Sequence, residues 1–198
     1  MLTVNNVSLE VVDNHANSTV LVIPGFSIDA YNSTVEHCKT IKSNVAIVKF
    51  NGVSDYAKQH VYVYESGSTK KVKAETAMYK KLATLILGKI KPLKNVTLLA
   101  KSAGAGVAWY LLKKKQIPLV YLQAPGFSDL TSPIKPPKCN QIYLAWNEDD
   151  DKIPYKTMPK VYKYIRDTIA KSSYDTLVYK KTYPIGKHEW QSAFIALV

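Results

Sequence analysis

The feature that most constrains how this 198-residue chain can fold is a serine, Ser102. It stands between very small residues, at the junction of two hydrophobic patterns. The run Val96–Leu99 is largely apolar and typical of a buried strand, and an amphipathic segment, Val107–Lys115, follows Ser102 closely. Ala100 and Gly104 stand two positions before and after that serine. A serine at a sharp strand-to-helix turn needs such neighbours, because adjacent backbone crowds the turn while the hydroxyl projects from the sheet. The same pattern also fits a tight turn in which Ser102 caps a helix.

The rest of the chain alternates between strand and helix patterns. Continuous apolar runs predict strands that are buried on both faces, and apolar residues at helical spacing predict helices. The predicted strands are 3–12 (an edge strand or hairpin arm), 20–23, 45–50, 96–99, 118–122, 142–146 and one that begins at 177. The predicted helices are 29–42, 74–90, 107–115, 158–169 and one after residue 189. This alternation predicts an α/β fold with a doubly wound, parallel sheet, whose functional residues lie at the carboxyl ends of the strands.

The positive charge of the chain is uneven. Residues 1–66 have a net charge of −2 and residues 67–198 a net charge of +14, which together make +12. A basic surface attracts nucleic acid, anionic membranes or acidic substrates. However, 26 of the 27 basic residues are lysine, whereas proteins that recognise nucleic acid favour arginine. We therefore interpret the charge mainly as a solvated surface.

Length and composition predict one domain over residues 1–198, because 46% of the residues are hydrophobic. No apolar run approaches the roughly 18–20 residues that a membrane-spanning helix needs. The first residues lack the basic and apolar regions of a signal peptide. Cys38 and Cys139 have no metal-binding or redox spacing. We expect a cytoplasmic protein without metal or cofactor.

Two later strand ends supply chemical partners for Ser102. A serine hydroxyl needs a base to take its proton, and a histidine base needs a carboxylate to hold its tautomer. The acidic run 148–151 follows one predicted strand, and His188 is the one histidine of four that lies beyond that run. The order Ser, acid, His, together with the turn around Ser102, resembles the α/β-hydrolase family and its G-x-S-x-G elbow. Ala100 replaces the first glycine of that motif, and Lys101 beside the serine is less usual.

The resemblance also points to one of the adjacent acids. The family's loop runs Asp-x-x-hydrophobic-Pro, and the segment from Asp150 to Pro154 fits that frame. Asp150 is therefore the expected member of the triad. Asp149 and Asp151 remain alternatives.

The site implied by the resemblance is a triad with an oxyanion hole. Ser102 is the nucleophile, His188 the base and Asp150 the acid. The backbone N–H groups of Ala103 and Phe26 form the oxyanion hole, the latter because Phe26 follows the Pro-Gly step that ends strand 20–23. The implied reaction is hydrolysis of a small carboxylic ester or thioester through an acyl-enzyme. It requires no metal and no organic cofactor.

The resemblance covers nearly the whole chain and implies a three-layer α/β-hydrolase fold. We expect about six or seven mostly parallel strands, helices on both faces and no cap, since the longest unassigned segments are only 51–73 and 123–140. We expect the Lys101 side chain to pack against a neighbour rather than to face an anionic substrate group.

Two rival functions remain open. A protein can keep this scaffold without catalysis and act as a binding module. The basic surface could alternatively bind nucleic acid or another anionic surface, although the single arginine and the absence of a recognised motif disfavour that role.

Overall fold

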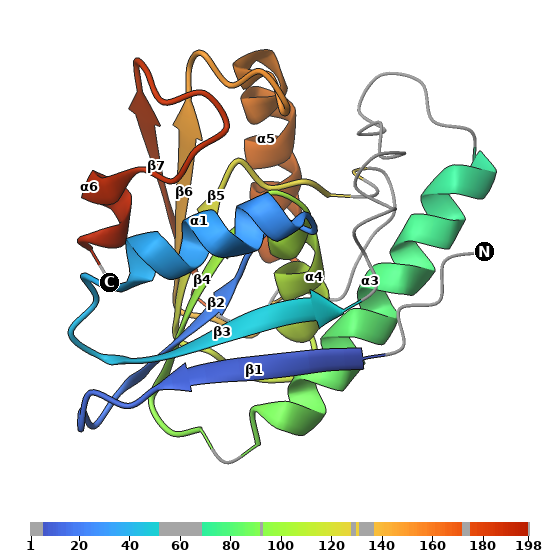
Figure 1. Ribbon diagram of the computed structural model, residues 1–198. Helices are drawn as coiled ribbons and strands as arrows, with labels where there is room; N and C mark the ends of the chain where they lie inside the picture. Colours follow the sequence, from blue (N-terminus) through green and yellow to red (C-terminus); the bar gives the residue numbers. More distant parts are fainter. Residues whose placement is uncertain are drawn as a thin grey trace.

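Parallel strands form the centre of the protein. The computed structural model describes residues 6–51, 69–91, 93–127, 130, 137–171 and 175–197. In these ranges seven strands form one sheet in the order β1-β3-β2-β4-β5-β6-β7 (Figure 1). The strands are β1 (Asn6–Val12), β2 (Thr19–Ile23), β3 (Asn44–Asn51), β4 (Val96–Lys101), β5 (Leu119–Gln123), β6 (Gln141–Asn147) and β7 (Leu177–Tyr183). Only β1 is antiparallel to its neighbour, so the predicted mostly parallel sheet and its edge strand are confirmed.

The strand order reverses between β2 and β4. From β2 the chain moves outward to β3, and it then returns across β2 to add β4, β5, β6 and β7 on the other side. At such a switch point the connections leave neighbouring strands in opposite directions, which opens a crevice at the carboxyl ends. Phe26 lies just beyond the end of β2, and Ser102 directly follows β4.

Helices cover both faces of the sheet (Figure 1). They are α1 (Ile28–Cys38) and α6 (Ser192–Ile195) on one face, and α3 (Thr69–Lys89), α4 (Ala103–Leu111) and α5 (Met158–Ile169), preceded by the short η1 (Tyr155–Thr157), on the other. Alternate side chains of β2 pack into the cores on opposite faces of the sheet. Leu21 and Ile23 join the core under α3, α4 and α5, whereas Val20 and Val22 join the core under α1 and α6. This is the predicted three-layer arrangement.

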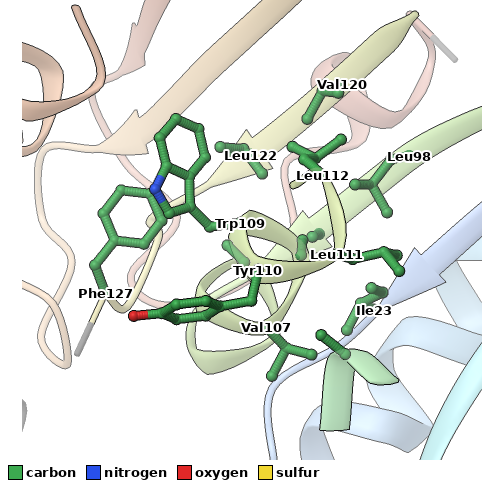
Figure 2. Close-up of a cluster of buried hydrophobic side chains, with 14 of the residues drawn as sticks. Ile23, Leu98, Val107, Trp109, Tyr110, Leu111, Leu112, Val120, Leu122 and Phe127 are labelled. Atoms are coloured by element: carbon green, nitrogen blue, oxygen red, sulfur yellow. The ribbon is translucent and has the colours of Figure 1, made fainter. Parts of the chain in front are cut away.

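Helix α4 differs from the prediction. The segment 107–115 was expected to be an amphipathic helix, but the helix begins at Ala103, ends at Leu111 and is buried along its whole length. Figure 2 shows the reason: Leu111 and Leu112 point toward side chains of the sheet, while Trp109 lies beside Phe127 on another side of the helix. The lysines at 113–115 lie in the turn that follows. A helix covered by both a sheet and other helices has no solvent face, so its polar residues mark only its end.

The boundaries of two further helices also differ from the prediction. Helix α1 ends at Cys38 rather than at residue 42, and α3 begins at Thr69 rather than at 74. The unpredicted start of α3, residues 69–73, contains one apolar residue, Val72, which is too few to show a helical pattern in the sequence. The possible short strand 62–64 lies outside the described residues. In the part of the chain that the structure describes, every helix and strand belongs to the sheet or covers it, and none forms a cap.

Candidate active site

Ser102 occupies a strained turn between β4 and α4. Its φ of 54° and ψ of −131° lie in a region that residues with a side chain rarely adopt. Neighbouring backbone holds this conformation. The Ser102 N–H donates to Gln123 O at 3.0 Å, and the Ser102 carbonyl accepts from Gly126 N at 2.7 Å and from Ala105 N at 3.0 Å. The strain is therefore maintained by contacts on both sides of the residue.

The small residues around Ser102 have a direct steric explanation. A β-carbon at Gly104 would lie 2.2 Å from Pro24 O and 2.3 Å from Ile23 O, so only glycine fits where α4 begins against the end of β2. Ala100, two positions before the serine, pairs with Ile23 on one side and with Leu122 on the other and is fully buried. Its methyl group is accommodated there, as expected for the residue that replaces the first glycine of the motif.

The acidic turn after β6 holds a carboxylate against His188. Atom Nδ1 of His188 lies 3.0 Å from Asp150 Oδ1 and 2.9 Å from Asp150 Oδ2. The backbone N–H groups of Lys152 and Ile153 donate to Asp150 Oδ1 at 2.9 and 2.7 Å, and the Asp150 side chain is only 1% exposed. These donors hold the carboxylate in a fixed orientation beside the His188 ring.

The neighbouring aspartates have other partners. Asp149 Oδ1 accepts from the backbone N–H of Lys187 at 2.7 Å. Asp151 is exposed and lies 3.6 Å from Lys152 Nζ. Of the three aspartates at 149–151, Asp150 is the one whose carboxylate contacts the His188 ring.

A cavity of about 470 Å³ brings the remaining predicted residues together. Ser102, Ala103, Phe26 and His188 all line it, and Asp150 lies behind His188. The turn after β2 runs beside the serine, since a β-carbon at Gly25 would lie 3.9 Å from Ser102 Oγ. The structure therefore unites all five residues at one end of the sheet, where β2, β4, β6 and β7 end.

The Phe26 ring anchors its side of the cavity. Its centroid lies 4.9 Å from that of Phe50 and 5.8 Å from that of Tyr79, both in edge-on contacts. Tyr79 belongs to α3, so the turn after β2 is packed against the helical layer and held near Ser102.

Known structures share this architecture. No protein-family model matches the sequence, and no curated protein matches it by sequence. Among solved structures, esterase PE8 has a TM-score of 0.67 at 11% identity, with 96% of this chain and 95% of that chain covered. A carboxylesterase from Mesorhizobium loti has a TM-score of 0.63 at 14% identity over 96% and 90% of the two chains. Acyl-protein thioesterase 2 from Zea mays has a TM-score of 0.60 at 13% identity over 96% and 95%.

This chain has the fold of the α/β-hydrolase superfamily. The likeness extends over almost the full length of both partners in each comparison, so it concerns the whole sheet and its covering helices. The predicted family fold is thereby confirmed. Within the described ranges, no helix combines the length and the apolar character that crossing a membrane requires.

Lys101, beside the serine, is buried in this α/β-hydrolase fold. Its Nζ donates to the carbonyl oxygen of His188 and lies 5.4 Å from the centre of the Trp190 ring. It therefore packs against a neighbour as predicted, while also lining the cavity. Burial lowers the pKa of Lys101 from 10.5 to about 8, and the negative charges of Glu189 and Asp150 partly oppose that shift.

Two further polar residues near the site were not predicted from the sequence. Gln123 closes β5 and Asn147 closes β6, and both are buried and hydrogen-bonded to the loop around His188. The sequence does show a polar residue at the end of each of these otherwise apolar strands. It does not show which group that residue binds, because the partner belongs to a loop far along the chain.

The remaining candidates for metal or redox chemistry do not join the cavity. Cys38 and Cys139 are free and buried, and burial raises the pKa of each thiol to about 12. No group of three or more His, Cys, Asp or Glu residues that could hold a metal ion occurs among the described residues. His15 lies exposed in a turn and His37 contacts the carbonyl of Ser33, while His60 lies outside the described residues.

Proposed function

We propose that this protein is a serine hydrolase that cleaves small carboxylic esters or thioesters through an acyl-enzyme. The observation that carries the proposal is the contact of His188 Nδ1 with both oxygens of Asp150, at a cavity that His188 shares with Ser102. When Nδ1 carries its proton toward the carboxylate, Nε2 is left as the basic nitrogen. The imidazole can then act as the base for the serine hydroxyl.

The reaction proceeds in two halves. His188 takes the proton of Ser102 as Oγ attacks the carbonyl carbon, and the resulting oxyanion accepts hydrogen bonds from the N–H groups of Phe26 and Ala103. The bond from carbon to the alcohol oxygen or thiol sulfur breaks, and His188 returns the proton to the leaving group. His188 then deprotonates a water molecule, which attacks the acyl carbon. The bond from that carbon to Ser102 Oγ breaks, His188 returns the proton to Oγ, and the acid is released. The positive end of α4 adds to the stabilisation of the oxyanion.

The substrate class follows from the size and surroundings of the cavity. Its volume of about 470 Å³ suits a small molecule. Apolar side chains of Phe26, Ala30 and Trp190 line it together with polar residues. The structural neighbours are named as an esterase, a carboxylesterase and an acyl-protein thioesterase, which agrees with ester or thioester cleavage.

A fluorophosphonate probe tests the proposal directly. Ordinary serines stay unlabelled because their hydroxyls remain protonated without an adjacent base. We expect one phosphonyl adduct per chain at Ser102, measured by mass spectrometry of the intact protein and its peptides. Ser102→Ala should abolish the adduct and His188→Ala should slow it severely. Ser8→Ala, on the distant edge strand β1, is the matched control and should be labelled at the normal rate.

The opposite result would favour a different function. A folded protein that stays unlabelled, with its melting temperature unchanged by the probe, would overturn the serine hydrolase proposal and favour a non-catalytic binding module. The same preparation could then be tested for salt-dependent binding to DNA, the second rival function.

A further inference from the structure

Three adjacent central strands end in buried polar residues. Lys101 is the last residue of β4, Gln123 of β5 and Asn147 of β6, and their exposed fractions are 6%, 0% and 1%. The residues before them in each strand are largely apolar and buried. Burying a polar or charged group is costly unless it is hydrogen-bonded. Each of these three side chains must therefore have a structural partner.

All three partners lie in one short loop. Lys101 Nζ donates to the carbonyl of His188, and Gln123 Nε2 donates to the carbonyl of Glu189 at 2.6 Å. Asn147 Nδ2 donates to the carbonyls of Lys187 and Glu189 at 2.8 and 3.1 Å. Side chains from three neighbouring strands thus bind three consecutive carbonyl groups, with His188 in the middle.

Two backbone N–H groups of the loop are also paired, that of Lys187 with Asp149 Oδ1 at 2.7 Å and that of Glu189 with Gly186 O at 3.0 Å. The loop follows β7 without entering a helix, and two of its residues, Gly186 and Lys187, have φ values of 143° and 45°. It also passes close to Asn147, since a β-carbon at Gly186 would lie 2.8 Å from Asn147 Nδ2. Its backbone is thus held largely by polar contacts with side chains from other elements.

We propose that Lys101, Gln123 and Asn147 are positioning residues that hold loop 187–189 and thereby align the His188 imidazole between Asp150 and Ser102. This inference rests on the proposed serine hydrolase function. The reason is geometric: the contact with Asp150 restrains only one edge of the ring, whereas proton transfer requires the opposite nitrogen to stay in line with the serine. The ring can hold that alignment only if its backbone is held as well.

Lys101 differs from the other two residues because its contact depends on charge. Its ammonium lies over the face of Trp190, and the acidic groups near it are Glu189 in the same loop and Asp150 after β6. Asp29 of α1 lines the same cavity. A charged donor makes a stronger hydrogen bond than a neutral one. Since the pKa of Lys101 is lowered to about 8, this hold should weaken as the pH rises above 8.

Lys101→Met tests the role of the ammonium while keeping a side chain of similar length. We expect amide hydrogen exchange in residues 187–190 to accelerate about tenfold or more, because a hydrogen bond to a charged group is lost. We expect kcat to fall about 10- to 100-fold with KM changed less than about threefold. Lys115→Met is the matched control, since Lys115 Nζ also donates to a carbonyl, that of Ile90, far from the cavity. It should leave both measurements unchanged.

A pH profile separates positioning from general structural support. The wild-type kcat should fall above pH 8, whereas Lys101→Arg should retain part of the activity without a fall near pH 8, because arginine stays charged. Asn147→Asp removes two donors without changing shape and should loosen the same loop. It provides a second test in case Lys101→Met does not fold.

The outcomes distinguish this inference from the proposed function. If Lys101→Met and Asn147→Asp both exchange at wild-type rates in residues 187–190, the positioning role is wrong even when the protein is active. If KM rises and kcat is unchanged, Lys101 contacts substrate instead, and the inference is overturned. If the wild type is never labelled by the fluorophosphonate, the proposed hydrolase function fails, while hydrogen exchange still shows whether the three residues hold the loop.

Discussion

Ser102 and His188 line the same cavity, but different kinds of contact hold their backbones. Backbone atoms surround the turn at Ser102: its own N–H and carbonyl are paired with neighbouring segments, and Gly104 beside it abuts the end of β2. The loop at His188 is held instead by the side chains of Lys101, Gln123 and Asn147. A turn packed against backbone atoms requires very small residues. A loop held by side chains instead requires hydrogen-bond donors at the ends of particular strands.

This difference has a consequence for how the two regions respond to mutation. Adding a methyl group at Gly104 should distort the turn at Ser102, because the atoms that it would meet belong to the backbone and not to a movable side chain. Removing a donor should damage the loop at His188, because its carbonyls lose their partners. The following predictions test this contrast, beginning with the largest expected effect.

Asp150→Asn should have the largest effect on the His188 side of the site. The amide cannot accept the Nδ1 proton as the carboxylate does, so the ring is no longer held in the basic tautomer. We expect kcat to fall about 10⁴-fold with the fold intact. Steady-state hydrolysis of a soluble ester measures the effect. Asp151→Asn is the control and should change kcat less than about threefold, since that exposed side chain lies against Lys152 rather than against His188. Equal losses in the two variants would contradict the assignment of Asp150.

Gly104→Ala should have the largest effect on the Ser102 side. The new β-carbon would lie 2.2 Å from Pro24 O, and the end of β2 or the start of α4 must move to relieve the clash. We expect a loss of about 3 kcal/mol or more in the free energy of unfolding, together with loss of fluorophosphonate labelling. Chemical denaturation measures the stability.

Gly88→Ala is the matched control for that substitution. A β-carbon at Gly88, near the end of α3, would meet nothing within 4 Å. Alanine is favoured over glycine in a helix, so this variant should gain roughly 0.5–1 kcal/mol. If Gly104→Ala is as stable as Gly88→Ala, the turn is not held by backbone crowding.

The pH dependence of stability gives the smallest effect and concerns Lys101. Its pKa is about 8 in the folded protein against an ordinary 10.5, so between these values the unfolded chain binds more protons than the folded chain. The stability contributed by this residue should therefore rise as the pH increases from 8 to 10.5, by at most about 3 kcal/mol. The kcat should fall over the same range, so stability and activity change in opposite directions.

Comparison with Lys101→Met isolates that contribution. Cys38 and Cys139 have pKa values raised to about 12, which lowers stability above pH 9 in both proteins and cancels in the difference. The wild type should gain stability relative to the variant between pH 8 and 10.5, measured by denaturant unfolding at each pH. A difference that stays constant with pH would show that Lys101 keeps its ordinary pKa.

The sequence predicted the order of the elements and the sheet, but not how fully α4 is covered. Continuous apolar runs identified the inner strands because a strand between two helical layers has no polar face. The same logic failed for α4, where a segment ending in three lysines suggested a solvent face at 107–115. The helix itself contains no charged residue, and its complete burial depends on α3, α5 and Phe127, which lie far from it in sequence.

The candidate site could be predicted only in part for the same reason. The elbow around Ser102 was recognisable because small residues stand at fixed distances from the serine. Choosing among residues 149–151 relied on the resemblance to a known loop, and the catalytic role of Asp150 stays a prediction. Gln123 and Asn147 were missed because a polar strand end carries no information about what it binds.

By itself the sequence determined the alternation of strands and helices and the absence of bulk around Ser102, because hydrophobic periodicity and small side chains are local properties. Only the tertiary structure decided that Lys101, Gln123 and Asn147 meet loop 187–189. Their contacts span 87, 66 and 40 residues along the chain. Parallel pairing brings the carboxyl ends of β4, β5 and β6 side by side, so side chains that are distant in sequence can bind consecutive carbonyls of one loop.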